Sequence, residues 1–416
     1  MQVTQVTQVA LVALVALAGS EPPDPAGVAQ LVTDFGLRLF RAALVARGDT
    51  NVILSPYGAT SVLVALQVAT AGRGRRQLEE AIGFSIDAPG VPAALRGLRR
   101  ALRGRAHALA VAQGLFVARG VPLRGPFVTR LGRALGPRGL ARLELRDGEG
   151  ARRVLNAWAR DRTRGLVSGL VPPGALSPRV RLLAASAEFF GGSWGVPFPA
   201  GATRARPFLR PDGSEGSADV MEATLRLRCG EGGTCVTCVS SPVCHLLCHL
   251  GVTCVALLLL APLERHVPVV TLVPLLDARS VTAWVAQLRP APRVLAVPRF
   301  SLETSWDLRG PLKALGILDL FDPERADFSP VTGDEQLVLG PVLQKVRMEV
   351  TENGTEAASA SAAVVYSRMA PPEIVLDRPF LFLIRHRPTG LGGFGAFWGI
   401  LGILGDLGGF WDFEGF

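Results

Sequence analysis

The chain has 416 residues, of which 49% are hydrophobic and only 19% are charged. This balance excludes an intrinsically disordered or collagen-like chain, and the length allows two or three domains of about 150 residues or one large domain. The formal net charge is +9, and it comes almost entirely from arginine, because the only lysines are Lys313 and Lys345. The charge is therefore compatible with a polyanionic partner.

The amino terminus predicts a secretory signal peptide over residues 1–18. Residues 9–18 (VALVALVALA) form an apolar run, which is shorter than the roughly 20 residues that a membrane span needs. Ala16-Leu17-Ala18 then provides a cleavage site with small residues. A buried N-terminal helix is the alternative, because no Lys or Arg precedes the run. We expect a secreted protein with no membrane span in residues 19–416.

Helices are predicted mainly in the first half of the chain and strands mainly in the second half. Ser55-Pro56 gives a clear helix start, because serine is a preferred N-cap and proline fits the first turn. Gly83 is expected to end another short helix. Strands and helices do not alternate regularly, so the order predicts an α+β fold. The predicted helices are 30–46, 55–71, 75–84, 92–105 and 151–171, and the predicted strands are 108–123, 181–190, 255–262, 269–273, 294–303 and 344–350.

The most informative segment follows the strand that ends at Val350. Residues 357–363 consist only of alanine and serine, which are too small to build a core but can enter a sheet as an extra strand without steric clash. A strand has a period of two, so Glu356 would lie on the solvent side. The opposite face would carry Thr355, Ala357, Ser359, Ser361, Ala363 and Val365.

A single arginine lies at the far end of this segment, in Arg368-Met369, shortly before Pro371 and Pro372. The fourteen residues from Gly354 to Arg368 span about 46–50 Å when fully extended, which is enough to cross a whole sheet. An arginine exposed on a loop fits the acidic specificity pocket of a trypsin-like protease. The segment thus combines a residue that a trypsin-like protease can recognise with a stretch that can enter a sheet as an extra strand.

Several sequence stretches resemble those of the serpin family and follow one another in the family's order. They are 51–57 (NVILSPY), 156–165, 297–307 (VPRFSLETSWD), 326–329, 349–360 and 377–390 (DRPFLFLIRHRPTG). The resemblance implies one serpin domain over residues 19–416, with helices packed around a large antiparallel or mixed β-sheet and further smaller sheets. It also implies an exposed reactive-centre loop, with its hinge, within residues 351–376.

The resemblance implies a suicide-substrate inhibitor of serine proteases, and neither an enzyme nor a cofactor-dependent protein. The target protease would attack the carbonyl of Arg368, and the cleaved loop would then insert into the sheet and carry the protease with it. Ser-Arg-Met-Ala at 367–370 is similar to the reactive bond of serpins that inhibit tissue-type and urokinase-type plasminogen activators, and so restrain fibrinolysis. We expect a monomer. The implied hinge comprises Glu352, Gly354, Thr355, Glu356, Ala357, Ala358, Ser359 and Ala360.

A stripe of arginines lies on the helix predicted over 92–105, at a spacing of three and four residues. Such a stripe suits a sulfated polysaccharide, and in related serpins this helix carries the heparin site. A solvated arginine face is the competing interpretation. Nucleic acid is not expected, because no aromatic residues are interleaved with the arginines. The candidate glycosaminoglycan-binding residues are Arg96, Arg99, Arg100, Arg103 and Arg105.

Two further expectations concern single positions. Arg119 matches an arginine of the vitronectin-binding surface that the resemblance brings, although Val128 stands where a methionine is expected nearby. Asn353-Gly354-Thr355 is an N-glycosylation sequon on the hinge itself. A glycan at Asn353 would obstruct insertion, so we expect the sequon to be unused.

A hydrolase is the competing enzymatic interpretation, since Gly191-Gly192-Ser193-Trp194-Gly195 fits the G-x-S-x-G pattern and His386 is available as a base. That pattern requires a helix directly after the serine. The following Val-Pro-Phe-Pro at 196–199 cannot start one. The resemblance instead implies that Trp194 belongs to a packed structural motif.

Three stretches depart from the family. Glu188 lies on the predicted central strand, where a carboxylate is costly if it is buried without a partner. The last family strand has no clear counterpart after Gly390, although 400–404 could imitate it, so an unpaired sheet edge is expected. Residues 229–254 replace a region where two strands should run. These atypical segments, 229–254 and 391–416, leave open a non-inhibitory or folding-defective serpin-like binding protein.

All six cysteines lie between Cys229 and Cys254. Cys235 and Cys238, with Cys244-His245 and Cys248-His249 nearby, have roughly the spacing of a zinc site, and three disulfides with fifteen possible connectivities are also conceivable. A translated non-coding segment is the third interpretation, and the one we favour, because the stretch resembles nothing in the family. We therefore predict no metal.

Overall fold

The computed structural model describes residues 25–47, 51–102, 109–136, 138–191, 194, 197–199, 201–231, 245–251, 255–262, 264–265, 267–333, 337–352, 371–386 and 392–398. Helices are concentrated before residue 163 in this part of the chain. They are α2 Pro25–Arg47, α3 Pro56–Ala69, α4 Gly72–Ile82, α5 Val91–Leu102, α6 Gly125–Leu135, α7 Gly148–Arg162, α8 Ala278–Gln287 and α9 Arg309–Ala314, with the 3-10 helices η1 Val269–Leu275 and η2 Asp319–Phe321.

The strands form two sheets. The nine-stranded sheet has the order β1-β14-β13-β8-β7-β6-β9-β12, with β5 paired to β6, and the five-stranded sheet has the order β10-β11-β4-β2-β3. The strands are β1 Val52–Ile53, β2 Leu109–Ala118, β3 Leu140–Leu143, β4 Leu182–Gly191, β5 Arg204–Leu209, β6 Glu215–Glu231, β7 His245–Gly251, β8 Val255–Pro262, β9 Arg289–Pro298, β10 Phe300–Asp307, β11 Leu339–Val350, β12 Glu373–Val375, β13 Leu381–His386 and β14 Gly392–Trp398.

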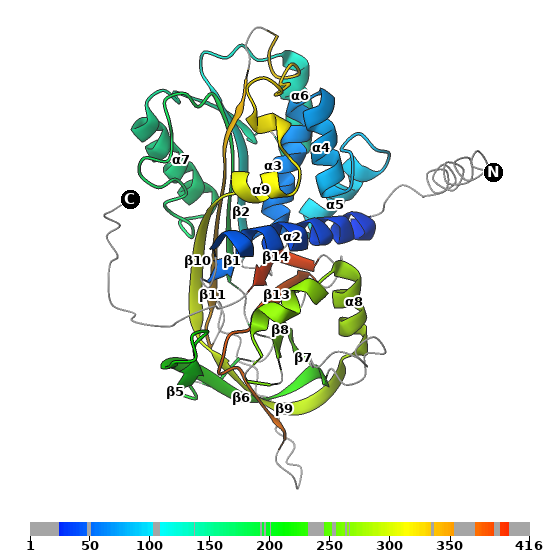
Figure 1. The fold of residues 1–416 in the computed structure, drawn as a ribbon, viewed down its shortest axis with the longest axis vertical. Helices are drawn as coiled ribbons and strands as arrows, with labels where there is room; N and C mark the ends of the chain where they lie inside the picture. The colour runs from blue at the N-terminus through cyan, green and yellow to red at the C-terminus, as the bar shows by residue number, and fades with distance from the viewer. Residues whose placement is uncertain are drawn as a thin grey trace, which may run out of the picture.

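The five-stranded sheet lies between helices. Figure 1 shows α7 on one side of it and α3 on the other, while α2 crosses the middle of the molecule above the nine-stranded sheet. Nine of the ten residues of β4 are buried, because this strand is central in the sheet and both of its faces are covered. The structure confirms the α+β class, with a helical half, a central sheet and a second sheet around β6 and β9.

Local sequence signals place several helix ends as predicted. The Ser55 hydroxyl accepts a hydrogen bond from the Gly58 N–H at the start of α3, and Pro56 occupies its first turn. Gly83 ends α4 in the left-handed conformation at φ 89°, which glycine adopts without a Cβ penalty. The strand predicted over Val255–Pro262 is confirmed with these bounds.

Some predicted elements differ from the structure. The single strand predicted over 294–303 is divided between β9 and β10, with Arg299 between them. The expected strand over Val269–Val273 is wrong, since Val269–Leu275 is a 3-10 helix that follows Pro268 and contains Pro274. A short apolar run does not distinguish strand from helix by its pattern. The helix predicted to reach residue 171 ends at Arg162, because Arg164 and Gly165 take positive φ.

No single helix among the described residues is long and apolar enough to cross a membrane. One pair, η1 with α8, reaches the required length and composition only together and across a bend of 105°.

Two expectations about missing strands are also wrong. The segment around the cysteines does not interrupt the sheet, because β6 continues to Glu231 and β7 pairs antiparallel with both β6 and β8. The sheet edge beyond β13 is not left unpaired either, since β14 pairs antiparallel with β13 and β1. This strand is Gly392–Trp398; residues 400–404, suggested from the sequence, lie outside the described residues.

Candidate functional site

The junction between β4 and β11 is the first part of the site, because β11 leads directly into the predicted loop. The two strands are direct neighbours and run parallel, with an unbroken register from Val342 opposite Ala184 to Glu349 opposite Gly191. Any strand that followed β11 and turned back between them would run antiparallel to both. The junction can therefore accept one more strand in the more stable antiparallel pairing.

The chain just beyond β11 is held in place by hydrogen bonds to its backbone. The Trp194 indole N–H donates to the Thr351 carbonyl at 2.5 Å, and the Phe198 N–H donates to the Glu352 carbonyl at 3.0 Å. Trp194 also packs edge-on against Phe198, with ring centroids 6.0 Å apart. These contacts fix the point from which the predicted hinge starts, and they confirm that Trp194 is part of a packed structural motif.

The side chain of Glu352 adds a polar anchor at the same point. Its Oε1 accepts a hydrogen bond from the Thr203 hydroxyl at 2.6 Å and lies 3.5 Å from the Arg299 guanidinium. Partial burial alone would raise the pKa of Glu352, but the bonds from Thr203 and its own backbone, with the charge of Arg299, hold that pKa below its ordinary value. Glu352 is thus ionised and fixed.

A buried network lies on the α3 face of the junction. The Gln344 amide donates to the Ser55 carbonyl at 2.9 Å and to the Ser186 hydroxyl at 3.3 Å, and it accepts from the Ser55 N–H at 3.1 Å. One side chain of β11 therefore connects the start of α3 with β4. Buried polar groups that are fully paired in this way fix one packing arrangement.

Two basic side chains lie on the α7 face of the same strand. Lys345 donates to the Gly169 carbonyl at 3.1 Å, and Arg347 donates to the Leu166 carbonyl at 3.3 Å. Lys345 also forms an ion pair with Glu303. The segment that follows α7 is therefore bound to β11 through its backbone carbonyls.

The far end of the predicted loop is attached to the other sheet. The Val294 N–H donates to the Pro372 carbonyl at 3.1 Å, and β12 then pairs parallel with β9. Residues 353–370 connect these two anchors and lie outside the described residues. This holds for the predicted reactive bond Arg368-Met369, for Asn353 and for every hinge residue except Glu352.

The predicted arginine stripe lies on α5. Arg96 and Arg100 are exposed, whereas Arg99 is half-buried and donates to the Ala134 carbonyl. Leu98 and Leu102 are buried on the opposite face, as predicted. Arg103 and Arg105 lie outside the described residues.

The structure adds two arginines that the sequence interpretation missed. Arg130 and Arg133 of α6 line a pocket of about 290 Å³ together with Arg96 and Arg99. Asp87 partly neutralises this group, since it accepts from Arg130 at 2.9 Å. Burial alone would raise the pKa of Asp87, but its arginine partners Arg75 and Arg130 hold that pKa below the ordinary value.

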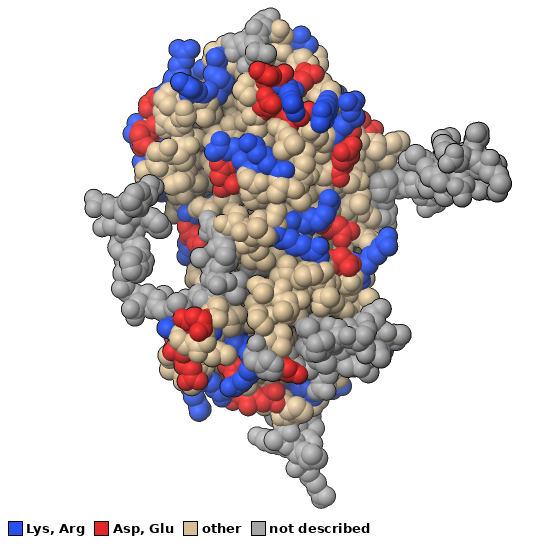
Figure 2. Space-filling model, viewed as in Figure 1, with Lys and Arg blue, Asp and Glu red and all other residues tan. Residues whose placement is uncertain are grey.

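Figure 2 shows that basic side chains over the helical half mostly have acidic neighbours. The i, i+3 spacing of Arg130 and Arg133 was the available sequence signal.

Arg119 lies exposed directly after β2. Its backbone is fixed by the bond from its N–H to the Leu143 carbonyl at 2.9 Å, and its carbonyl accepts from Arg142. Val128, where a methionine was expected, is 42% exposed on α6. Both positions are thus accessible on the surface.

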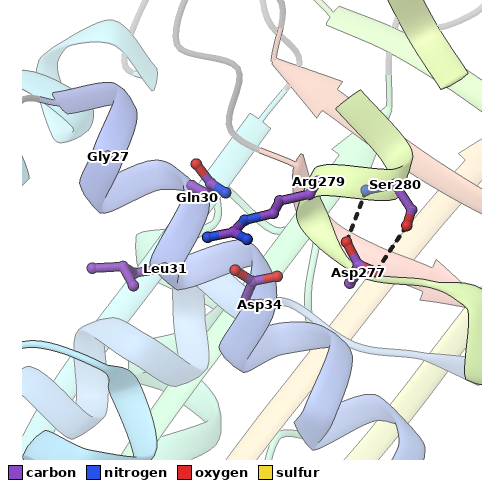
Figure 3. Close-up of a pocket in the computed structure, with 7 residues that line it drawn as sticks. All are labelled: Gly27, Gln30, Leu31, Asp34, Asp277, Arg279 and Ser280. Carbon is purple, nitrogen blue, oxygen red and sulfur yellow. Dashed lines mark hydrogen bonds between the residues drawn. The ribbon is translucent and has the colours of Figure 1, made fainter. Parts of the chain in front are cut away.

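A pocket of about 660 Å³ lies between the start of α2 and α8. Figure 3 shows Asp277 turned towards Ser280, where it accepts bonds from the Ser280 N–H and hydroxyl at 2.8 Å each. Asp34 accepts from the Ala278 N–H at 2.9 Å. The acidic groups of this pocket hold the start of α8.

The competing interpretations receive no support from the described residues. Trp194 and residues 197–199 contain no helix, so the hydrolase pattern lacks the element it needs; Ser193 itself is not described. No group of three or more His, Cys, Asp or Glu residues that could hold a metal comes together in the described part of the chain. Cys235, Cys238 and Cys244 are outside it.

Comparison with known proteins agrees with this geometry. A family profile described as Serpin (serine protease inhibitor) matches residues 30–395. The chain is 38% identical over 372 residues to plasminogen activator inhibitor 1 of Sus scrofa, with 87% of this chain and 90% of the relative covered. It is 29% identical over 368 residues to glia-derived nexin of Rattus norvegicus, with 87% and 90% covered.

Solved structures give the same result. The structure of native protease nexin-1 with heparin superposes with a TM-score of 0.82 at 28% identity, covering 90% of this chain and 99% of that one. Maspin superposes with a TM-score of 0.79 at 20% identity, covering 90% and 98%, and supports the fold alone. The match over most of the chain and the direct parallel pairing of β4 with β11 in the five-stranded sheet lead to one conclusion: the chain belongs to the serpin family of serine protease inhibitors.

Proposed function

We propose that this protein is a secreted serpin that traps trypsin-like plasminogen activators covalently by cleavage at Arg368-Met369 and insertion of the cleaved loop. The observation that carries the proposal is the direct parallel pairing of β4 with β11. A strand made of residues 354–368 would be antiparallel to both neighbours, and its alanine and serine side chains fit between them. The signal-like residues 1–18 and the similarity to plasminogen activator inhibitor 1 support the compartment and the targets.

The decisive experiment is incubation of the purified protein with urokinase-type or tissue-type activator, followed by denaturing electrophoresis. We expect a complex that survives SDS in wild type. Arg368→Glu should abolish the complex, whereas the matched control Arg153→Glu, on an exposed position of α7, should form it normally. Cleavage after Arg368 without any stable complex would instead identify a non-inhibitory serpin-like protein.

The insertion step has its own matched pair of variants. In the inserted strand, Ala357 would face the buried side and Glu356 the solvent side. Ala357→Arg should therefore convert the inhibitor into a substrate that is cleaved but not trapped. Glu356→Arg carries the same new side chain one position earlier and should keep trapping. Equal effects of the two variants would contradict insertion in this register.

A second proposed function is binding of heparin-like glycosaminoglycans, which the arginine pocket between α5 and α6 favours. The solved structure of protease nexin-1 with heparin supports this for a related protein. Arg96→Glu with Arg100→Glu should elute from a heparin column at lower salt, because binding by charge weakens with ionic strength. Arg153→Glu with Arg160→Glu on α7 changes the net charge equally. If both double variants elute alike, the arginines act only through net charge.

Vitronectin is the remaining proposed partner, through the exposed Arg119. Arg119→Ala should weaken binding to immobilised vitronectin, with Arg124→Ala, at the exposed N-cap position of α6, as the control. Unchanged binding of Arg119→Ala would remove this residue from the proposed surface.

A further inference from the structure

One buried carboxyl group of the central sheet has no role in the proposed trapping reaction. Glu188 lies in the middle of β4, opposite Val346 of β11 on one side and Val111 of β2 on the other. Its residue surface is only 3% exposed. Among the described residues, neither carboxyl oxygen has a hydrogen-bond partner of normal geometry.

Gly58 of α3 provides the space that this carboxyl group occupies. A methyl group added at position 58 would overlap the Glu188 carboxyl, so the acid lies directly against the backbone of the first helical turn. A helix start ordinarily favours a negative charge through its free N–H groups. Here Ser55 binds two of them, because its hydroxyl accepts from Gly58 at 3.1 Å and its carbonyl accepts from Ala59 at 3.0 Å.

No charged side chain of the neighbouring described elements faces Glu188. On β11 the residues of its face are Gln344, Val346 and Met348, and on β2 they include Val111 and Gln113. Tyr57 is the titratable side chain of α3. The charged residues of β11 and β10 alternate onto the α7 face of the sheet; they are Lys345, Arg347, Glu349, Glu303 and Asp307.

Burial in these surroundings raises the pKa of Glu188 well above its ordinary value, and the Ser186 hydroxyl on the same face opposes only part of that effect. The group is therefore neutral in the closed sheet at pH values where an exposed glutamate would be ionised. Separation of β4 from β11 would let water reach it.

We propose that Glu188 is a proton-linked control on the opening of the β4–β11 junction, neutral while the strands are paired and ionised once they part. The proposal rests on the proposed function in one respect, because insertion of the loop requires this opening. Its physical basis is the buried acid at the junction, whose carboxyl has no hydrogen-bond partner among the described residues and lies against Gly58.

The sign of the effect follows from linkage. Opening returns the pKa of Glu188 toward the ordinary value of about 4.3, so opening releases a proton between that pH and the raised pKa of the closed sheet. The stability of the closed sheet is therefore fully present below the ordinary carboxyl pKa and is lost as the pH rises through the raised value. In this window the equilibrium for opening should increase by up to about tenfold per pH unit.

The test uses the full-length protein. Wild type, Glu188→Gln and the control Glu349→Gln are incubated between about pH 5 and pH 8, and residual inhibition of a trypsin-like protease is measured at one fixed pH. We expect activity to be lost faster at higher pH in wild type and in Glu349→Gln, and at a rate independent of pH in Glu188→Gln. The same pH profile in wild type and Glu188→Gln would overturn the proposal. Glu188→Leu replaces the glutamine variant if that variant does not fold.

A second readout separates this proposal from the proposed function. Hydrogen exchange of the β4 and β11 amides is compared between wild type and Glu188→Gln at each pH. If no protein shows inhibition at any pH, the proposed function fails, while exchange still reports on the junction. Faster exchange of wild type relative to the variant as the pH rises supports the proton-linked opening, and a constant ratio contradicts it.

Discussion

The two faces of β11 are stabilised in different ways, although their residues alternate along one strand. The α3 face carries buried, uncharged groups, and Gln344 connects Ser55 to Ser186 there. The α7 face carries Lys345 and Arg347, which bind the carbonyls of the segment after α7. Insertion of an additional strand beside β11 therefore has to break or rearrange contacts on both faces. We infer that the contacts on the α3 face determine the free energy of the closed sheet. The contacts on the α7 face determine how easily the segment after α7 separates from β11.

The largest expected effect is on the α3 face. Gln344→Ala removes three hydrogen bonds and leaves the buried Ser55 N–H without its partner, so the free energy of unfolding should fall by about 3 kcal/mol. Urea denaturation measures this. Lys345→Ala, the adjacent residue on the other face, should cost clearly less; equal losses would remove the distinction between the faces.

A somewhat smaller effect should follow from Gly58→Ala, because the new methyl group overlaps the Glu188 carboxyl. We expect a loss of about 1–3 kcal/mol in the free energy of unfolding, as is typical of overpacking. Glu188→Ala should relieve the overlap, so a double-mutant cycle should show strong coupling. If the two losses of unfolding free energy are additive, the side chains at positions 58 and 188 are not in contact.

On the α7 face, Lys345→Met should reduce the free energy of unfolding by only about 1 kcal/mol, because the carboxylate that pairs with Lys345, that of Glu303, is exposed to solvent. Its distinctive effect should be local. Hydrogen exchange around Leu166 and Gly169 should become faster, while exchange in α3 should not change. Faster exchange in α3 would mean that the two faces are not independent.

The smallest effect concerns pH at the anchor beyond β11. The lowered pKa of Glu352 contributes stability that is present above the ordinary carboxyl pKa and is lost as the pH falls through the lowered folded value. This is the opposite direction to Glu188. Because Glu352 is partly exposed, we expect only a few tenths of a kcal/mol, after discounting for solvent screening. Unfolding midpoints of wild type and Glu352→Gln should therefore converge in acid; a constant difference would contradict the assignment.

The contacts that could be predicted from the sequence are local ones. Ser55, Pro56 and Gly83 act within a few residues, so the ends of α3 and α4 follow from the sequence alone. The anchor of Glu352 could not be predicted, because Thr203 and Arg299 are distant in the chain. The contribution of Arg130 and Arg133 to the arginine surface of α5 could not be predicted either, because α6 is separated from α5 along the chain.

The glycine-rich strand β14 shows a second limit. Glycine disfavours strands, so Gly392–Trp398 carries a weak local signal. Its pairing partners β13 and β1 supply the order that the local sequence lacks. The resemblance to serpins identified the family correctly, whereas propensity alone argued against the last strand.

The rarity of lysine gives one contact a practical consequence. With only Lys313 and Lys345 in the chain, an amine-reactive reagent has two side chains to modify. Lys313 is exposed, whereas Lys345 has 9% of its side chain exposed and is held by Gly169 and Glu303. The rate of acylation at Lys345 would therefore report how often the segment after α7 separates from the sheet.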